Sequence, residues 1–236
     1  MASISGILFD VDETLFDRDL AQRLVLDVFM SRFSDLFRGI ADEHLLVAFV
    51  ESDRISNAEY EAGLPMSEVR KRRFEIFLEL IDADKAYADQ IAALYVREYP
   101  ELNAPIAGAR ELISQLAGRF KLGIISNGFP DVQYRKLAAI GMSAEFECVV
   151  LSEELGISKP DPEIFRHALS LMGMSPEEAF YIGDSFGHDV VGAIGVGMQV
   201  IWYNPHGSTP ARTDIEATYE VTELAAVLSL LPAEYR

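Results

Sequence analysis

The chain has 236 residues, half of them hydrophobic, which suits one large domain or a core domain with a smaller insert. Its 38 acidic and 20 basic residues give a net charge of -18, which argues against binding of a nucleic acid polymer. The single cysteine, Cys148, excludes an intrachain disulfide and is expected to be buried and inert. Neither a signal peptide nor an apolar run of about 18 residues is found, so we expect a cytoplasmic protein without a membrane span.

The first predicted element is a short buried strand, Ile7-Leu8-Phe9, that ends at Asp10 and Asp12. Ligands in open α/β sheets bind at such strand ends, and residues two apart point the same way, so both carboxylates are expected to face one pocket. A cation between them or a retained proton would relieve their repulsion. The stretch therefore predicts a metal site, an acid/base pair, or both if Asp12 binds the metal through its backbone carbonyl. Its composition also fits an ordinary turn.

The next eighty residues contain apolar residues at helical spacing and no convincing strand. The predicted helices are Arg18 to Phe37, Ala41 to Val50, Met66 to Ile81 and Ala86 to Tyr99. A helical insert directly after the first strand-end loop predicts a cap domain over residues 17–103 that could close over the site.

From Ala104 onward, predicted helices and strands alternate, which indicates an α/β fold with a doubly wound parallel sheet over residues 1–16 and 104–236. The predicted strands are Leu122 to Ile125, Cys148 to Leu151, Ala179 to Ile182 and Gln199 to Tyr203. The predicted helices are Gly108 to Ala117, Asp131 to Ile140, Asp161 to Met172, a short one from about Asp189, and Glu223 to Leu231. Asp161 and Pro162 have the residue types of an N-cap and a first helical position.

Three later stretches place further polar residues near strand ends. Ser126, Asn127 and Gly128 combine a hydroxyl with a flexible backbone, which suits a phosphate site but also an ordinary turn. Lys159, which is followed by Pro160 and Pro162 and lies ahead of a helix, would supply positive potential to a phosphoryl group. Asp184 could complete an oxygen-rich Mg²⁺ site with Asp10, whereas His188 without a Cys/His cluster does not predict zinc.

Four motifs in this order resemble those of the haloacid dehalogenase superfamily of aspartate-nucleophile phosphatases. They are DVDET at Asp10 to Thr14, SNG at Ser126 to Gly128, KPDP at Lys159 to Pro162 and GDSFGHD at Gly183 to Asp189. The helical insert lies where that family carries its cap, so the resemblance covers nearly the whole chain. It implies a Rossmann-like core with an all-helical cap.

The resemblance also implies roles for these residues. Asp10 would attack phosphorus and form an aspartyl phosphate, and Asp12 would protonate the leaving oxygen and later activate water. Lys159 would steady the nucleophile, and Ser126, Asn127 and Gly128 would bind the phosphoryl oxygens. The implied cofactor is Mg²⁺, held by Asp10, Asp184 and the carbonyl of Asp12, with Thr14 and Asp189 in support. The acidic Glu13 departs from the family pattern, and we expect it to point away from the phosphate.

Within the superfamily, the stretches IISNGFPDVQ, LSEELGISKPDPEIF and VIWYNPHG are most similar to bacterial pyrimidine 5′-nucleotidases. We therefore expect a small phosphorylated metabolite as substrate, with a nucleoside monophosphate favoured. The alternatives are a sugar phosphate, N-acylneuraminate 9-phosphate or phosphoglycolate. Phosphomutase, 2-haloacid dehalogenase and non-catalytic binding functions rank behind hydrolysis. Among the basic residues of the cap, Arg73 is expected to be the one that faces the site.

Overall fold

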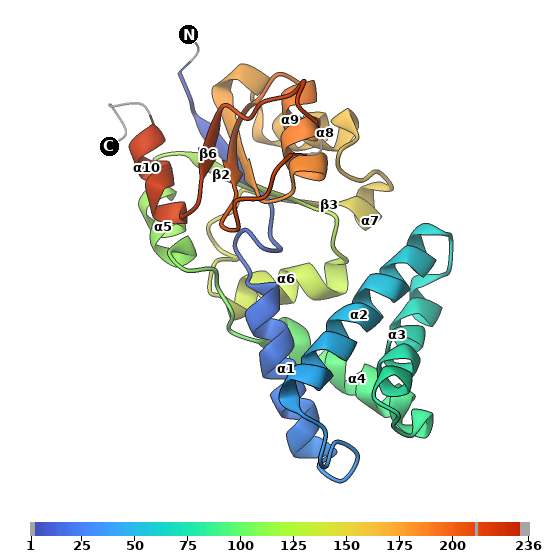
Figure 1. Ribbon diagram of the computed structural model, residues 1–236. Coiled ribbons are helices and arrows are strands. Elements are labelled where there is room, and N and C mark those ends of the chain that lie inside the picture. Colours follow the sequence, from blue (N-terminus) through green and yellow to red (C-terminus); the bar gives the residue numbers. More distant parts are fainter. Residues whose placement is uncertain (1–2, 211, 232–236) are drawn as a thin grey trace. The chain divides into compact units, whose positions relative to one another are not determined.

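The computed structural model describes residues 3–210 and 212–231 (Figure 1). The chain divides into two compact units, one made of the residues up to Asp17 together with those from Asn103 onward, and the other of Arg18–Leu102. The functional names of catalytic core and cap remain predictions for these two units. Among the described residues, no helix has both the length and the apolar character needed to cross a bilayer.

The first unit is built on a six-stranded sheet with the order β3-β2-β1-β4-β5-β6. Its strands are β1 (Gly6–Phe9), β2 (Lys121–Ser126), β3 (Cys148–Leu151), β4 (Ala179–Gly183), β5 (Gln199–Tyr203) and β6 (Tyr219–Val221). Every neighbouring pair is parallel, and Phe9 of β1 is in register with Ile124 of β2 and Ile182 of β4. The chain winds outward from β1 in both directions, so the crevice between diverging connections opens beyond the carboxyl ends of β1 and β4.

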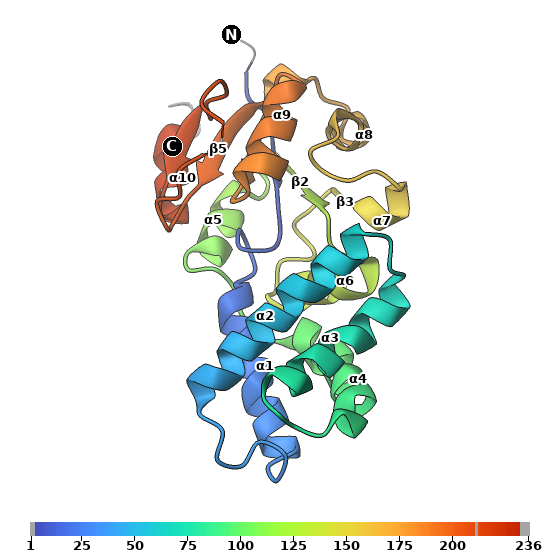
Figure 2. The ribbon, with the colours of Figure 1, turned by 45° about the vertical axis from the view of Figure 1, so that its right-hand side comes forward.

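Helices cover both faces of this sheet, which confirms the predicted α/β fold class. They are α5 (Ala109–Leu116), α6 (Pro130–Ala139), α7 (Ser152–Leu155), α8 (Pro162–Met172), α9 (Val191–Gly195) and α10 (Val227–Leu230). Figure 1 and Figure 2 both show α8 and α9 on one side of the sheet and α5 and α10 on the other. Strands β1 and β4 are buried along their whole length, as expected when both faces are covered.

Helix α8 shows how local sequence sets an element that frames the site. The side chain of Asp161 accepts a hydrogen bond from the backbone N–H of Glu163, Pro162 opens the helix, and Gly173 ends it in the left-handed conformation. Its buried face packs against the sheet in a cluster that includes Phe165 and Tyr181. The N-cap predicted from the sequence is therefore present, and it fixes the chain directly after Lys159.

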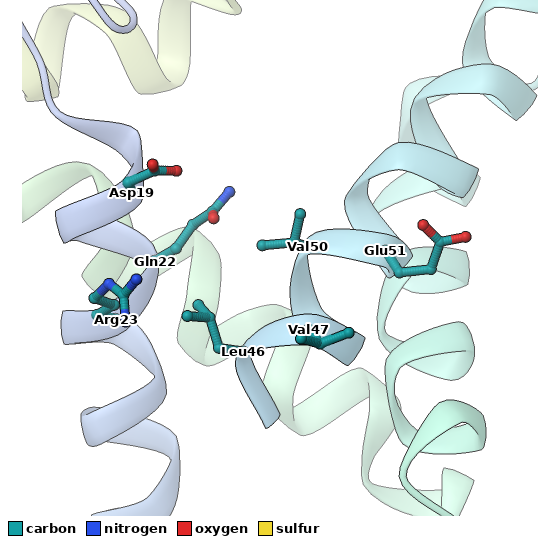
Figure 3. A pocket seen from close by; sticks show the side chains of 7 residues that line it. All are labelled: Asp19, Gln22, Arg23, Leu46, Val47, Val50 and Glu51. Atoms are coloured by element: carbon teal, nitrogen blue, oxygen red, sulfur yellow. The ribbon is translucent and has the colours of Figure 1, made fainter. Parts of the chain in front are cut away.

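The second unit is helical, with α1 (Arg18–Arg32), α2 (Asp42–Glu61), α3 (Met66–Leu80) and α4 (Ala88–Glu98). Its interior is aromatic: the ring of Phe49 lies edge-on to Phe29 and to Phe77, with centroids 6.0 and 5.4 Å apart. A pocket of about 470 Å³ lies between α1 and α2. Figure 3 shows the side chains of Gln22, Leu46 and Val50 pointing toward one another in it. Helix α2 runs eleven residues beyond the predicted end at Val50.

Candidate active site

The loop after β1 folds back on itself and fixes Asp10 at the end of the strand. The backbone N–H of Asp10 still donates to the carbonyl of Ile182 on β4, at 2.9 Å. The N–H groups of Leu15 and Phe16 then both donate to the carbonyl of Val11, at 2.8 Å each, which closes a tight turn. Asp10 is 7% exposed, so its carboxylate is held in a largely dry position.

Lys159 is the centre of a buried network at this strand end. Its ammonium Nζ donates to Oδ1 of Asp10 and to Oδ1 of Asp189, each at 2.7 Å, and to the hydroxyl of Tyr181 at 3.0 Å. Tyr181 comes from the middle of β4, and its hydroxyl lies 3.0 Å from Oδ1 of Asp189 and 3.2 Å from the carbonyl of Ile125. The structure thus brings together three residues that the sequence predicted and adds Tyr181, which it did not.

The pKa values of the acidic residues show that this end of the sheet has a surplus of negative charge. Burial raises the pKa of Asp10 to about 8; Lys159 opposes the rise, and Asp189, Asp184 and Asp12 reinforce it. Burial likewise raises the pKa of Asp184 to about 7, helped by the charge of Asp189. Burial alone lowers the pKa of Lys159, but the two carboxylates that it contacts outweigh that effect and raise it.

These carboxylates fit a hard divalent cation. One ligand oxygen from each of Asp10, Asp184 and Asp189 lies within 4.8 Å of the others, and their mutual repulsion adds to the burial that raises the pKa values of Asp10 and Asp184. Asp189 already uses Oδ1 for Lys159 and Oδ2 for the backbone N–H of Ser185, at 2.9 Å. Asp10 and Asp184 are therefore the better candidates for direct ligands, with Asp189 in support.

Gly183 is required by the position of Asp189. A Cβ atom on Gly183 would lie 2.4 Å from Oδ2 of Asp189, closer than any side chain tolerates. The glycine that precedes Asp184 in the fourth motif therefore makes room for a carboxylate from the following helical turn. His188 is exposed and its backbone N–H donates to Oγ of Ser185; it lies in the helical turn Phe186–Val190 rather than in a loop.

The SNG stretch has more than one structural task. The side-chain oxygen of Asn127 accepts from the backbone N–H of Lys159 at 2.8 Å, and its amide nitrogen donates to the carbonyl of Lys159 at 3.0 Å. Asn127 therefore fixes the backbone of the catalytic lysine candidate. The N–H of Gly128 donates to Oγ of Ser126 at 3.1 Å, so this hydroxyl sits at the base of the turn.

Asp12 does not take part in the carboxylate cluster through its side chain. Its Oδ2 accepts from Nε2 of Gln133 at 2.6 Å, and its Oδ1 accepts from Nζ of Lys136 at 2.5 Å. Both partners lie on α6 and were missed in the sequence. Their signal is their spacing: positions 133, 136, 137 and 140 form one buried stripe, and a polar residue on such a stripe demands a partner.

Two further residues, Glu13 and Thr14, belong to the loop that follows Asp10. Glu13 adopts a left-handed backbone conformation, with φ of 58°, and its charge adds to those that raise the pKa of Asp184. Its influence therefore reaches the candidate metal site, although we expected it to point away from the phosphate. Thr14 is fully buried, and within the described part of the chain no group hydrogen-bonds its Oγ1.

The expectation that Arg73 faces a substrate is wrong. Its side chain is buried within the helical unit, where Nη1 lies 2.9 Å from Oδ1 of Asp53 and 3.0 Å from the hydroxyl of Tyr95. The guanidinium carbon also stands 4.4 Å from the ring centroid of Phe49. The helical period turns this residue inward with Phe74, so Arg73 stabilises the aromatic interior of the unit.

Comparisons with known proteins show what this chain is similar to. The family model described as haloacid dehalogenase-like hydrolase matches residues 4–197. The chain is 29% identical to the pyrimidine 5′-nucleotidase YjjG of Escherichia coli, over 95% of this chain and 96% of that one. It is 32% identical to a glyceraldehyde 3-phosphate phosphatase of Methanopyrus kandleri, over 84% and 83%. The crystal structure of the HAD-hydrolase YfnB from Bacillus subtilis bound to magnesium matches with a TM-score of 0.81 at 28% identity, over 97% and 99%.

Proposed function

The chain belongs to the haloacid dehalogenase-like hydrolase family, and from this premise we propose that it is a Mg²⁺-dependent phosphomonoester hydrolase that works through an aspartyl phosphate. One observation carries the proposal: the buried carboxylate of Asp10 lies 2.7 Å from the ammonium of Lys159 and within 4.8 Å of a ligand oxygen of Asp184. A nucleophile, a cation to steady it and a second carboxylate for a metal are thus gathered at one strand end.

The proposed reaction is two successive displacements at phosphorus. An oxygen of Asp10 attacks the phosphoryl group, and the leaving alcohol oxygen takes a proton from Asp12. Asp12 then accepts a proton from water as that water attacks the same phosphorus, which releases inorganic phosphate and restores the carboxylate of Asp10. Lys159 offsets negative charge on the nucleophile and the phosphoryl group, and the hydroxyl of Ser126 and the backbone N–H of Asn127 bind phosphoryl oxygens.

Magnesium fits this scheme because a phosphoryl dianion has to approach several carboxylates. Asp10, Asp184 and the backbone carbonyl of Asp12 would hold the ion, and it would offset charge on the phosphoryl oxygens. The use of both side-chain oxygens of Asp12 by Gln133 and Lys136 supports a role for its carbonyl rather than its carboxylate. The magnesium bound to the Bacillus subtilis relative supports the same metal here.

For the substrate we propose a nucleoside monophosphate, supported by the relationship over nearly the full length to the pyrimidine 5′-nucleotidase. The glyceraldehyde 3-phosphate phosphatases among the relatives keep a small sugar or acid phosphate as the second candidate. A 2-haloacid dehalogenase has no alkoxide to protonate and needs no metal, so Asp12 and Asp184 would be without a task. We therefore place hydrolysis of a phosphomonoester first.

Phosphate release from a panel of phosphomonoesters tests both parts of the proposal. The panel contains purine and pyrimidine nucleoside monophosphates, glyceraldehyde 3-phosphate, other sugar phosphates, phosphoglycolate and 4-nitrophenyl phosphate, each with Mg²⁺ and with a chelator. We expect Mg²⁺-dependent release led by a nucleotide. Release led by a sugar or acid phosphate would replace the substrate and keep the mechanism. Absence of release from every compound would contradict the phosphatase assignment.

A further inference from the structure

Helix α6 holds two polar side chains one turn apart against the carboxylate of Asp12. Gln133 donates from Nε2 to one oxygen at 2.6 Å, and Lys136 donates from Nζ to the other at 2.5 Å. We propose that Gln133 and Lys136 are positioning residues that fix Asp12 for its two proton transfers. This inference rests on the proposed phosphatase function, and it assigns to α6 a task in the reaction that the four motifs do not include.

The burial of Lys136 is hard to explain by packing alone. Its side chain is 4% exposed, and its ammonium lies between Asp12 and the ring of Phe16, whose centroid is 4.7 Å away. Burying an ammonium is unfavourable in free energy unless a countercharge and well-placed contacts compensate the lost hydration. An apolar residue at the same position on α6 would not carry this desolvation penalty. The presence of a lysine at this buried position is therefore best explained by its hydrogen bond to Asp12, which holds that carboxylate in place.

The amide of Gln133 is oriented so that its nitrogen faces Asp12, which leaves its side-chain oxygen without a hydrogen-bond donor among the described residues. Its Nε2 donates to Asp12 and, at 3.2 Å, to Oγ of Ser126, whereas within the described residues no donor reaches its buried Oε1. The opposite orientation of the amide would set an oxygen against the carboxylate of Asp12, which is repulsive. One side chain thus links the residue proposed to move protons with the hydroxyl proposed to bind phosphate.

Gly128 leaves the space in which the amide of Gln133 contacts Asp12 and Ser126. A Cβ atom on Gly128 would lie 1.8 Å from Nε2 of Gln133, so a side chain there would displace the amide. The glycine of the second motif, which the sequence suggested for close approach of a phosphate, thus serves the position of Gln133. The second motif and α6 form one unit around Asp12.

Fixing both oxygens matters because proton transfer depends steeply on geometry. A carboxylate offers about four lone-pair sites, so two donors still leave sites for the leaving oxygen and for water. Without its partners Asp12 would rotate about its side-chain bonds and spend less time in line with either proton. We therefore expect the loss of a partner to resemble, in weaker form, the loss of Asp12.

The test uses leaving groups that differ in their need for a proton. The variants Lys136→Met and Gln133→Leu keep approximate size and remove the donor, and kcat/KM is measured with a nucleoside 5′-monophosphate and with 4-nitrophenyl phosphate. The value of kcat/KM reports the step that expels the leaving group. We expect each variant to lose about 10²-fold on the nucleotide and less than about tenfold on the nitrophenyl ester, with the same pattern, more pronounced, in Asp12→Asn.

A double variant and a matched control complete the experiment. Adding Lys136→Met to Asp12→Asn should cost no more than about twofold, because a residue that acts through Asp12 has nothing left to position. Lys121→Met is the same substitution at an exposed lysine whose Nζ donates to the carbonyl of Met172, and it should change neither rate by more than about twofold. Activity on the nitrophenyl ester shows that each variant is folded.

Equal losses on both esters, or full additivity with Asp12→Asn, would overturn the positioning role and leave the proposed function intact. A wild-type protein that releases phosphate from no compound of the panel would instead overturn the proposed function, and the inference with it.

Discussion

Two buried lysines, Lys159 and Lys136, each bind an aspartate of the loop after β1, but their surroundings differ. Lys159 contacts Asp10 and also Asp189, so one ammonium faces two carboxylates. Lys136 and Asp12 form a pair of opposite unit charges. The first arrangement leaves a deficit of positive charge and the second does not. The comparison indicates why two aspartates only two residues apart would have different tasks.

The deficit around Lys159 is visible in the pKa values of Asp10 and Asp184, which burial and mutual repulsion raise to about 8 and about 7. A divalent cation would relieve both. On the α6 side, directed donors from Gln133 and Lys136 hold the carboxylate of Asp12. The deficit of positive charge around Asp10 is consistent with a nucleophile that works beside a metal ion. The balanced charges of Asp12 and Lys136 are consistent with a residue that transfers protons.

The substitution with the largest expected effect is Asp10→Asn, which would remove the nucleophile from the Lys159 side. Because the amide has the same shape and cannot attack phosphorus, we expect turnover to fall by at least about 10⁴-fold while the protein stays folded. Steady-state phosphate release together with a thermal unfolding curve measures both. A variant that keeps a substantial share of wild-type turnover would refute the assignment of Asp10.

Lys159→Met is expected to slow both esters equally, whereas Lys136→Met is expected to slow the nucleotide more than the nitrophenyl ester. Lys159 is proposed to act on the nucleophile and the phosphoryl group, so kcat/KM should fall by about 10²- to 10³-fold on the nucleotide and the nitrophenyl ester alike. The change also leaves Asp10 and Asp189 without their cation, which should lower the free energy of unfolding by about 3–5 kcal/mol. Urea unfolding gives the second quantity. If the two esters were affected unequally, the distinction between the two lysines would fail.

The difference between the lysines also explains what the sequence could and could not reveal. Lys159 was found because Pro160 and Pro162 follow it and restrict its backbone just ahead of a helix N-terminus. Lys136 and Gln133 were missed because Q-x-x-K inside a helix is a common surface pattern. Only their place on the buried stripe of α6 distinguishes them, and the stripe becomes visible once the sheet shows which face is covered.

The fold was predictable where periodicity was strong. The strands from β1 to β5 lie within one residue or two of the predicted ranges, because their apolar runs are bounded by clear turn residues. Strand β6 (Tyr219–Val221) was missed, since three residues at an edge with two of them exposed carry no period. Arg73 was expected to face the site because, in the basic run Arg70 to Arg73, it is the residue that adjoins Phe74, whereas packing against Phe49 decides its place.

Stability against pH tests the charge deficit around Lys159 in the metal-free protein. Asp10 and Asp184 have pKa values raised from 3.8 to about 8 and about 7, so the folded state retains protons that the unfolded state has released. Their contribution is therefore complete below about pH 4 and is lost as the pH rises to about 8. We expect the urea midpoint in chelator to fall between pH 5.5 and pH 8.5.

Added Mg²⁺ competes with these protons, so it should raise the urea midpoint more at pH 8.5 than at pH 5.5. Asp184→Asn is the control, because it removes one of the titrating groups and a proposed ligand and should flatten both dependences. Carboxylates with a lowered pKa, such as Glu178, change stability mainly below this window. An equal effect of Mg²⁺ at both pH values would show that the ion binds elsewhere.

The smallest expected effect concerns Tyr181, whose hydroxyl lies 3.0 Å from the ammonium of Lys159. In Tyr181→Phe the ammonium keeps its bonds to Asp10 and Asp189, so kcat/KM should fall by less than about tenfold. The lost hydroxyl also leaves the buried carbonyl of Ile125 without that contact, which should lower the free energy of unfolding by about 1–3 kcal/mol.

Tyr134→Phe is the matched control for Tyr181→Phe, because the hydroxyl of Tyr134 is exposed and its contact with Glu154 at 3.2 Å is a surface one. Its free energy of unfolding should stay within about 0.5 kcal/mol of wild type. If Tyr181→Phe instead lost as much kcat/KM as Lys159→Met, the ammonium would need the hydroxyl to hold its position. The Lys159 side would then depend on a positioning residue as the Asp12 side is proposed to do, and the two lysines would differ only in charge balance.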